Sequence, residues 1–126
     1  MKAQRFVRAN CHLPVKNLKG TLAYYRDTLG FYEEWTWQEK DGGIRRDELR
    51  LLFGENPAYT AVINSNENRF AVLWFVDNIE EIYTEYKNKG ITIADPLREH
   101  PYQMKEFAFI DINGYYIRVC EGTESV

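Results

Sequence analysis

Apolar and polar residues alternate near the end of the chain in a way that predicts two strands joined by a tight turn. In the stretch EFAFIDINGYYIRV, residues 106–119, the apolar positions that alternate are Phe107, Phe109, Tyr115, Ile117 and Val119. A period of two residues is typical of a half-buried strand. Asn113 and Gly114 separate the two runs and favour a hairpin turn, because both residue types tolerate positive φ. The other face of the second strand then carries Arg118.

Two segments have the period of an amphipathic helix instead. Residues 18–29 carry an apolar stripe made of Leu18, Leu22, Tyr25 and Leu29, and residues 78–89 carry one made of Ile79, Ile82, Tyr83 and Tyr86. Spacings of three and four residues place such side chains on one helical face. Asn17 is predicted to cap the first helix, and Asp77 or Asn78 the second. Gly30 and Gly90 are predicted to end them.

The remaining apolar runs predict strands separated by turns and polar loops. Strands are expected over residues 5–15, 31–40, 70–76 and 91–95, with two short ones inside 43–53. Turns are expected at residues 41–43 and 47–48, and loops over 54–69 and 96–101, where Gly, Pro and polar residues concentrate.

The predicted elements form an internal repeat of the sequence. The pattern Val15-x-Asn17-Leu18 returns as Val76-x-Asn78-Ile79, and Tyr25 and Gly30 have counterparts at Tyr86 and Gly90, about sixty residues later in each case. Each half reads as strand, helix and three strands, and internal repetition is stronger evidence than any single motif. We predict an α+β chain forming a single domain over residues 1–126, with module 1 at about 5–54, module 2 at about 70–122 and a joining loop at 54–69.

Composition and charge exclude some classes of function but identify none. The 126 residues are 44% apolar and 28% charged, which is ordinary for a globular domain, and 15% are aromatic. The formal charge of −3 and the lack of a basic cluster disfavour nucleic-acid binding. No apolar run is long enough for a membrane span or a signal peptide, so we expect no membrane association and a cytoplasmic location. Cys11 and Cys120 are expected to be free thiols.

Three stretches resemble the vicinal oxygen chelate superfamily, which includes glyoxalases, bleomycin-resistance proteins and dioxygenases. They are residues 13–31, 74–91 and 104–119, and the stretches 43–53 and 105–119 are most similar to bleomycin-resistance-type proteins. The resemblance implies two tandem βαβββ modules, the glyoxalase/bleomycin-resistance fold, with curved mixed sheets that form a cup. It also implies a homodimer, which could exchange its N-terminal strand between chains.

Enzymes of this superfamily hold a divalent metal at fixed strand positions. The resemblance places these positions on Asn10, Val72 and Arg118. An amide is a weak ligand, valine has no donor atom, and a guanidinium keeps its protons. We therefore expect no metal, no cofactor and no catalytic residue at these positions.

The same reasoning predicts the residues that line the cup. By strand parity Arg118 faces into it, where its guanidinium either binds a ligand group or pairs with an acidic neighbour such as Glu106. If Val72 faces inward, then Trp74 does so by alternation. The complete set of expected ligand-binding residues is Asn10, His12, Trp35, Trp37, Trp74, Glu106, Tyr116 and Arg118. The alternative for each ring is packing in the core or against a partner chain.

We expect a non-enzymatic small-molecule binding protein of the bleomycin-resistance type, with antibiotic resistance as one biological role. It would sequester a planar aromatic ligand, which could also be cationic, and its partners would be that ligand and a second copy of the chain. Two alternatives stay open at this point. One is a glyoxalase- or dioxygenase-like metalloenzyme with an atypical metal site, and the other is a housekeeping binding module for an unknown ligand.

Overall fold

The computed structural model of the chain describes residues 3–122. The first group of elements is β1 (His12–Val15), α1 (Leu18–Asp27), β2 (Tyr32–Trp37), β3 (Asp41–Arg46) and β4 (Leu49–Glu55). A connecting helix, α2 (Pro57–Ile63), follows. The second group is β5 (Ala71–Phe75), α3 (Ile79–Asn88), β6 (Thr92–His100), β7 (Met104–Ile110) and β8 (Tyr116–Gly122).

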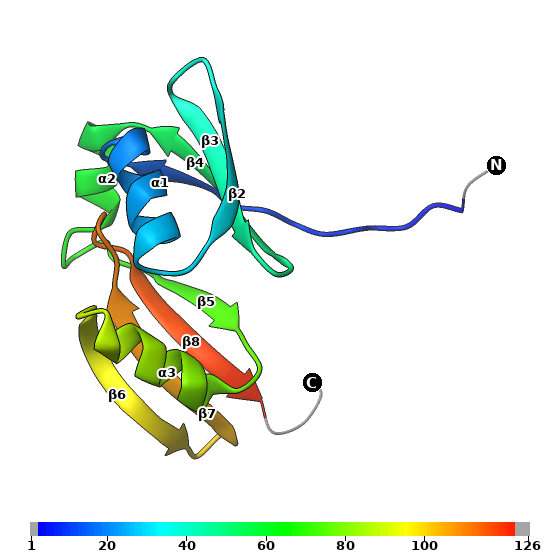
Figure 1. Cartoon of the computed structure of the whole chain (residues 1–126), viewed down its shortest axis with the longest axis vertical. Helices are drawn as coiled ribbons and strands as arrows, with labels where there is room; N and C mark the ends of the chain where they lie inside the picture. The colour runs from blue at the N-terminus through cyan, green and yellow to red at the C-terminus, as the bar shows by residue number, and fades with distance from the viewer. Residues whose placement is uncertain (1–2, 123–126) are drawn as a thin grey trace.

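The strands form two four-stranded sheets with the same internal order. The first sheet runs β1-β4-β3-β2 and the second runs β5-β8-β7-β6. β1 pairs in parallel with β4, and β5 pairs in parallel with β8. All other neighbouring strands are antiparallel. Figure 1 shows α1 beside the first sheet and α3 beside the second. The predicted α+β fold with a repeated βαβββ unit is confirmed.

The helix ends follow the sequence signals, with one difference. The side chain of Asn17 accepts a hydrogen bond of 2.6 Å from the backbone N–H of Gly20 and so caps α1 as predicted. Asn78 precedes α3, but it has a left-handed backbone (φ 57°) and its side chain caps nothing. The carboxylate of Glu121 accepts from the N–H of Ile79 instead, at 2.8 Å. A residue from β8 therefore does the capping for which the sequence offered Asp77 or Asn78.

The predicted first strand is mostly wrong. Only His12–Val15 forms a strand, which pairs in parallel with Leu52–Glu55, although β4 itself begins at Leu49. Residues 3–11 lie in no strand or helix, and all of them are exposed. Figure 1 shows this segment running away from the body of the protein. We call residues 3–11 the N-terminal arm.

The predicted turn at residues 41–43 is also displaced. The β2–β3 hairpin turns at residues 38–40, where Gln38 and Glu39 have positive φ, and Gly42 and Gly43 lie inside β3. A Cβ on Gly43 would lie 2.6 Å from Nε1 of Trp35. These glycines therefore allow close approach of neighbouring groups rather than a turn.

Two predicted loops contain regular structure. The stretch 54–69 includes α2, which Asn56 caps by accepting from the N–H of Tyr59, with Pro57 at its start. The strand predicted over 91–95 continues to His100 through Pro96, so part of the expected loop 96–101 is strand. Proline is tolerated there because β6 is an edge strand with irregular pairing on its inner side.

The core lies between each sheet and the helix that covers it, and it continues from one module to the other. The ring of Tyr25 on α1 contacts Phe31, Phe53 and Trp74, and the last of these belongs to β5 of the second module. The hydroxyl of Tyr25 donates to Oδ2 of Asp111 at 2.6 Å. Shared ring packing and a buried hydrogen bond thus join the two modules.

A second contact joins the modules at their surface. The guanidinium of Arg46 on β3 donates to the carboxylate of Glu85 on α3 at 2.9 and 3.0 Å, and to the carbonyl oxygen of Leu29 at 2.9 Å. The hydroxyl of Tyr86 donates to the same carbonyl at 3.0 Å.

The helices within the described residues are all too short or too polar to cross a membrane.

Candidate functional site

Each sheet has one face covered by helices and one open face. In the second sheet Phe107 packs against Tyr83 and Tyr86 of α3, which identifies the covered side. Side chains alternate along a strand, so Glu106 and Arg118 lie on the open side. The parity predicted for Arg118 is therefore observed.

The centre of this open face is an ion pair. Arg118 donates from Nε to Oε2 of Glu106 at 2.6 Å and from Nη2 to Oε1 at 2.9 Å. The hydroxyl of Tyr102 also donates to Oε1 of Glu106, at 2.8 Å. The side chain of Glu106 is almost fully buried. Of the two roles considered for Arg118, pairing with Glu106 is the one the structure shows.

The pair controls the protonation state of this region. Hydrogen bonds from Arg118 lower the pKa of Glu106 from 4.5 to about 2, although burial acts in the opposite direction. Burial raises the pKa of Cys120, whose Sγ lies 3.6 Å from Oε1 of Glu106, to about 11. The thiol is therefore protonated at neutral pH and is a poor nucleophile.

Trp74 does not lie on this face, so the predicted position of its ring is wrong. It pairs in register with Val119, is only 4% exposed and packs against Phe31 and Phe109. Val72 shares its side of β5. The stretch 70–76 is apolar at every position, so no alternation reveals which residues face the helices.

The open side of β5 carries two residues that sequence reasoning missed. Leu73 is in register with Arg118, and Phe75 is in register with Cys120. The ring of Phe75 is 64% exposed. The parity of Arg118 on β8 could have identified both residues had the register between β5 and β8 been known.

The open face of the first sheet holds three of the predicted residues. Trp35 is 49% and Trp37 62% exposed, and both lie on β2. Nε2 of His12 lies 3.1 Å from Oδ1 of Asp41. Leu18 of α1 approaches Gly42 whereas Trp35 approaches Gly43, so Trp35 lies on the side away from the helix.

Of the last two predicted residues, one lies apart from these groups. Asn10 is in the exposed N-terminal arm and belongs to no sheet. Tyr116 is half-buried on β8, on the side of the strand that Arg118 shares. The structure thus brings Glu106, Tyr116 and Arg118 to the open face of one sheet and His12, Trp35 and Trp37 to that of the other.

The divalent metal of the related enzymes does not fit these residues. Arg118 is held by Glu106, Val72 faces the helices, and Asn10 lies outside the sheet. Within residues 3–122 no three His, Cys, Asp or Glu side chains gather closely enough to hold a metal ion. The side chains at the three superfamily metal positions therefore do not form a donor set that fits a divalent metal.

Replacing Gly43 by alanine is expected to cost about 1–3 kcal/mol in the free energy of unfolding, because a Cβ would approach the indole of Trp35 to 2.6 Å and the carbonyl oxygen of Leu51 to 2.8 Å. Urea denaturation measures this cost, and the fluorescence of Trp35 should change in the folded state. Gly20→Ala in α1, where the nearest atom to the added Cβ is Oδ1 of the flexible Asn17 side chain at 3.0 Å, is the control. Equal stability of Gly43→Ala and the parent protein would contradict the close packing of Trp35.

Solved structures similar to this chain share its fold at low identity. A bleomycin-binding protein from bleomycin-producing Streptomyces verticillus, complexed with copper(II)-bleomycin, is 21% identical with a TM-score of 0.75, over 97% of this chain and 100% of that one. A bleomycin resistance determinant encoded on transposon Tn5 is 21% identical with a TM-score of 0.72, over 94% and 100%. TioX from Micromonospora sp. ML1 is 14% identical with a TM-score of 0.73, over 92% and 98%.

None of the curated proteins matches the chain significantly. The model of the Glyoxalase/Bleomycin resistance protein/Dioxygenase superfamily matches residues 6–119, which is nearly the whole sequence. The repeated βαβββ topology and the similar solved structures agree with this match. The chain therefore belongs to the glyoxalase/bleomycin resistance protein/dioxygenase superfamily.

Proposed function

We propose that this chain is a non-enzymatic binding protein that sequesters a planar aromatic small molecule against the open faces of its sheets. The exposure of large rings on these faces carries the proposal: Trp35, Trp37 and Phe75 are half or more exposed on β2 and β5. Exposed apolar surface of this kind is costly unless a ligand or partner covers it. Flat ligands stack on such rings at little entropic cost.

The ion pair at the centre of the second sheet shapes the chemistry of the proposed site. The guanidinium of Arg118 is occupied by Glu106, so it offers little free charge to an anionic ligand. Trp35 and Trp37 attract a cationic group through their ring faces. Such a site favours a neutral or cationic aromatic ligand, and the similar Streptomyces verticillus protein binds copper(II)-bleomycin.

The proposed binding unit is a homodimer. The N-terminal arm exposes Phe6 completely and Val7 largely, and no other part of the described chain covers them. β1 and β5 are edge strands, each with one side free of strand pairing. An arm that crosses to a second copy and pairs with an edge strand would cover both features. The ligand would then lie in a cleft between the open sheet faces of two copies, which we call the proposed cleft.

Titration with metal-free and with copper-loaded bleomycin, followed by tryptophan fluorescence, tests the proposal. Saturable quenching at about micromolar concentration or below is expected, and Trp37→Ala should weaken binding about threefold to tenfold through lost stacking. Tyr59→Ala removes an exposed ring on α2 and is the matched control, which should bind as the parent protein does.

Two results would overturn the proposal. One is the lack of any response to either form of bleomycin from a protein that elutes as a monomer in size-exclusion chromatography. The other is a stoichiometric divalent metal after exhaustive dialysis, measured by elemental analysis, which would favour the metalloenzyme alternative.

A further inference from the structure

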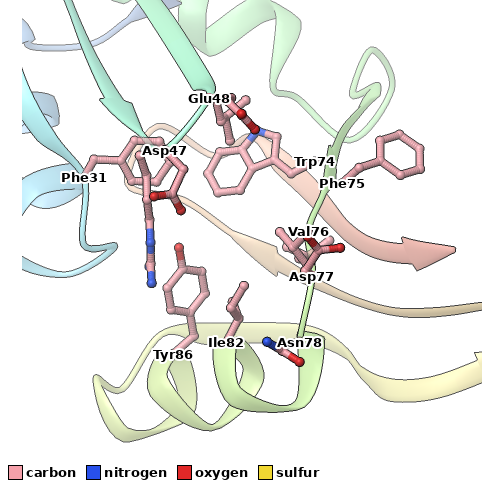
Figure 2. Close-up of a pocket in the computed structure, with 13 residues that line it drawn as sticks. Phe31, Asp47, Glu48, Trp74, Phe75, Val76, Asp77, Asn78, Ile82 and Tyr86 are labelled. Carbon is pink, nitrogen blue, oxygen red and sulfur yellow. The ribbon is translucent and has the colours of Figure 1, made fainter.

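A cavity of about 440 Å³ lies at the junction of the two modules, away from the open faces. Its wall is formed by Phe31, the β3–β4 turn at residues 47–48, the end of β5 and the first turns of α3. Figure 2 shows Phe31, Trp74, Ile82 and Tyr86 directed toward a common space, whereas the ring of Phe75 points away from it. The cavity is therefore a separate feature from the proposed cleft.

One buried polar atom in the cavity wall has no partner. Nε1 of Trp74 is buried, and it makes no hydrogen bond to any part of the described chain. A buried N–H without an acceptor is unfavourable and uncommon in folded proteins. Tyr86 and Arg46, which also line the cavity, both donate to the carbonyl of Leu29. Because Nε1 of Trp74 is itself buried, the indole contributes ring surface to the cavity wall rather than an accessible donor.

The rim of the cavity is acidic. Asp47, Glu48 and Asp77 line it, and all three are exposed. Glu48 and Asp77 take part in no ion pair within residues 3–122. The carboxylate of Asp47 accepts a hydrogen bond of 3.4 Å from the hydroxyl of Tyr32, and its carbonyl accepts one of 2.8 Å from Arg45, which is paired with Glu33. The positive charge at this rim, Arg46, is neutralised by Glu85. The uncompensated charge at the entrance is therefore negative.

We propose that this cavity binds a small organic cation with a flat apolar body. The body would pack against Phe31, Trp74 and Ile82, and a protonated amine would lie near Glu48 and Asp77. The volume of the cavity is within the range of small-molecule sites, and its lining combines apolar side chains with polar groups, as such sites require. This site is additional to the proposed cleft and does not depend on it.

The indole N–H signals in a ¹⁵N-labelled sample test this proposal directly. The chain has three tryptophans, and Trp74→Phe assigns the signal of Trp74. Titration with 4-methoxyphenethylamine at neutral pH is expected to shift the Trp74 signal saturably. The signals of Trp35 and Trp37, on an open sheet face, are expected to stay in place. Those two signals report on the proposed cleft, so the two sites are tested separately in one sample.

Matched ligands and variants separate the contributions. 4-Methoxyphenylacetate has the same body with opposite charge and should bind much more weakly. Glu48→Gln and Asp77→Asn should each weaken binding of the amine about twofold to fivefold. Glu99→Gln, an exposed carboxylate on β6 outside the cavity, should have no effect.

The outcomes are distinguishable. A Trp74 signal that does not move, or that moves equally with the anion, overturns the cavity proposal. Shifts confined to Trp35 and Trp37 also overturn it while leaving the open-face cleft standing. A saturable shift of Trp74 supports the cavity even if bleomycin does not bind.

Discussion

Replacing Asp111 by alanine is expected to lower the free energy of unfolding by about 3–5 kcal/mol, because three buried donors would lose their acceptor. Its carboxylate accepts from the hydroxyl of Tyr25 at 2.6 Å and from the backbone N–H groups of Asn113 and Tyr115 at 2.9 Å each. The side chain is buried where the modules meet. Urea denaturation monitored by circular dichroism measures the loss.

The control for this change is Asp77→Ala, since Asp77 is exposed and its loss should change stability by no more than about 0.5 kcal/mol. Similar effects of the two substitutions would contradict the role of Asp111 in joining the modules. Asp111→Asn keeps an acceptor and should cost clearly less than alanine.

Asp111 also makes a contribution to pH dependence that the asparagine variant removes. Burial raises the pKa of Asp111 above its usual 3.8, even though its hydrogen bonds lower it. The folded state then holds this proton to higher pH than the unfolded state does. Its contribution to stability is present below pH 3.8 and is lost as pH rises through the folded pKa. The difference in stability between the parent and Asp111→Asn should therefore change over this range, and a constant difference would contradict the raised pKa.

Arg118→Met is expected to have the second largest effect, a loss of about 3 kcal/mol at pH 7. It leaves the carboxylate of Glu106 buried without its cation, which is costly. Arg118 is itself 29% exposed in its side chain, which keeps the effect near the lower end of the usual range. The double variant Arg118→Met/Glu106→Gln should recover part of the loss, and a double-mutant cycle measures the coupling.

The pH dependence of this pair has the opposite sign to that of Asp111. The pKa of Glu106 is about 2 in the folded protein against an ordinary 4.5, so the unfolded state binds the proton more readily. The pair stabilises the protein above pH 4.5, by about 3 kcal/mol, and this contribution is lost as pH falls toward 2. The gap between the parent and Arg118→Met should therefore narrow in acid. Parallel stability curves would show that the ion pair does not hold the pKa of Glu106 down.

Local signals in the sequence predicted the helices and the final hairpin well. The stripe from Leu18 to Tyr25 and the cap at Asn17 are both observed, because helix period and capping depend on residues a few positions apart. The turn around Gly114, which has φ 92°, is observed for the same reason. The α2 helix was missed, although Asn56 followed by Pro57 is a recognisable helix start.

The site was predictable only where the strand pattern alternates. Glu106 and Arg118 were placed correctly because Phe107, Phe109, Ile117 and Val119 reveal the covered face. β5 is apolar throughout, so the side that Trp74 takes depends on its register with β8. No local pattern contains that register, so the predicted position of Trp74 in the cup was wrong.

The sequence alone determined that this protein has two βαβββ modules, because periodicity, caps and the repeat act over short stretches of chain. It also determined that Asn10, Val72 and Arg118 stand at the metal positions of the superfamily, where they are poor metal ligands. Only the tertiary structure decided that Glu106 holds Arg118, that Trp74 lies in the core beside a cavity, and that the N-terminal arm leaves the sheet. These outcomes depend on contacts between residues far apart in sequence, whose register and packing no local pattern specifies.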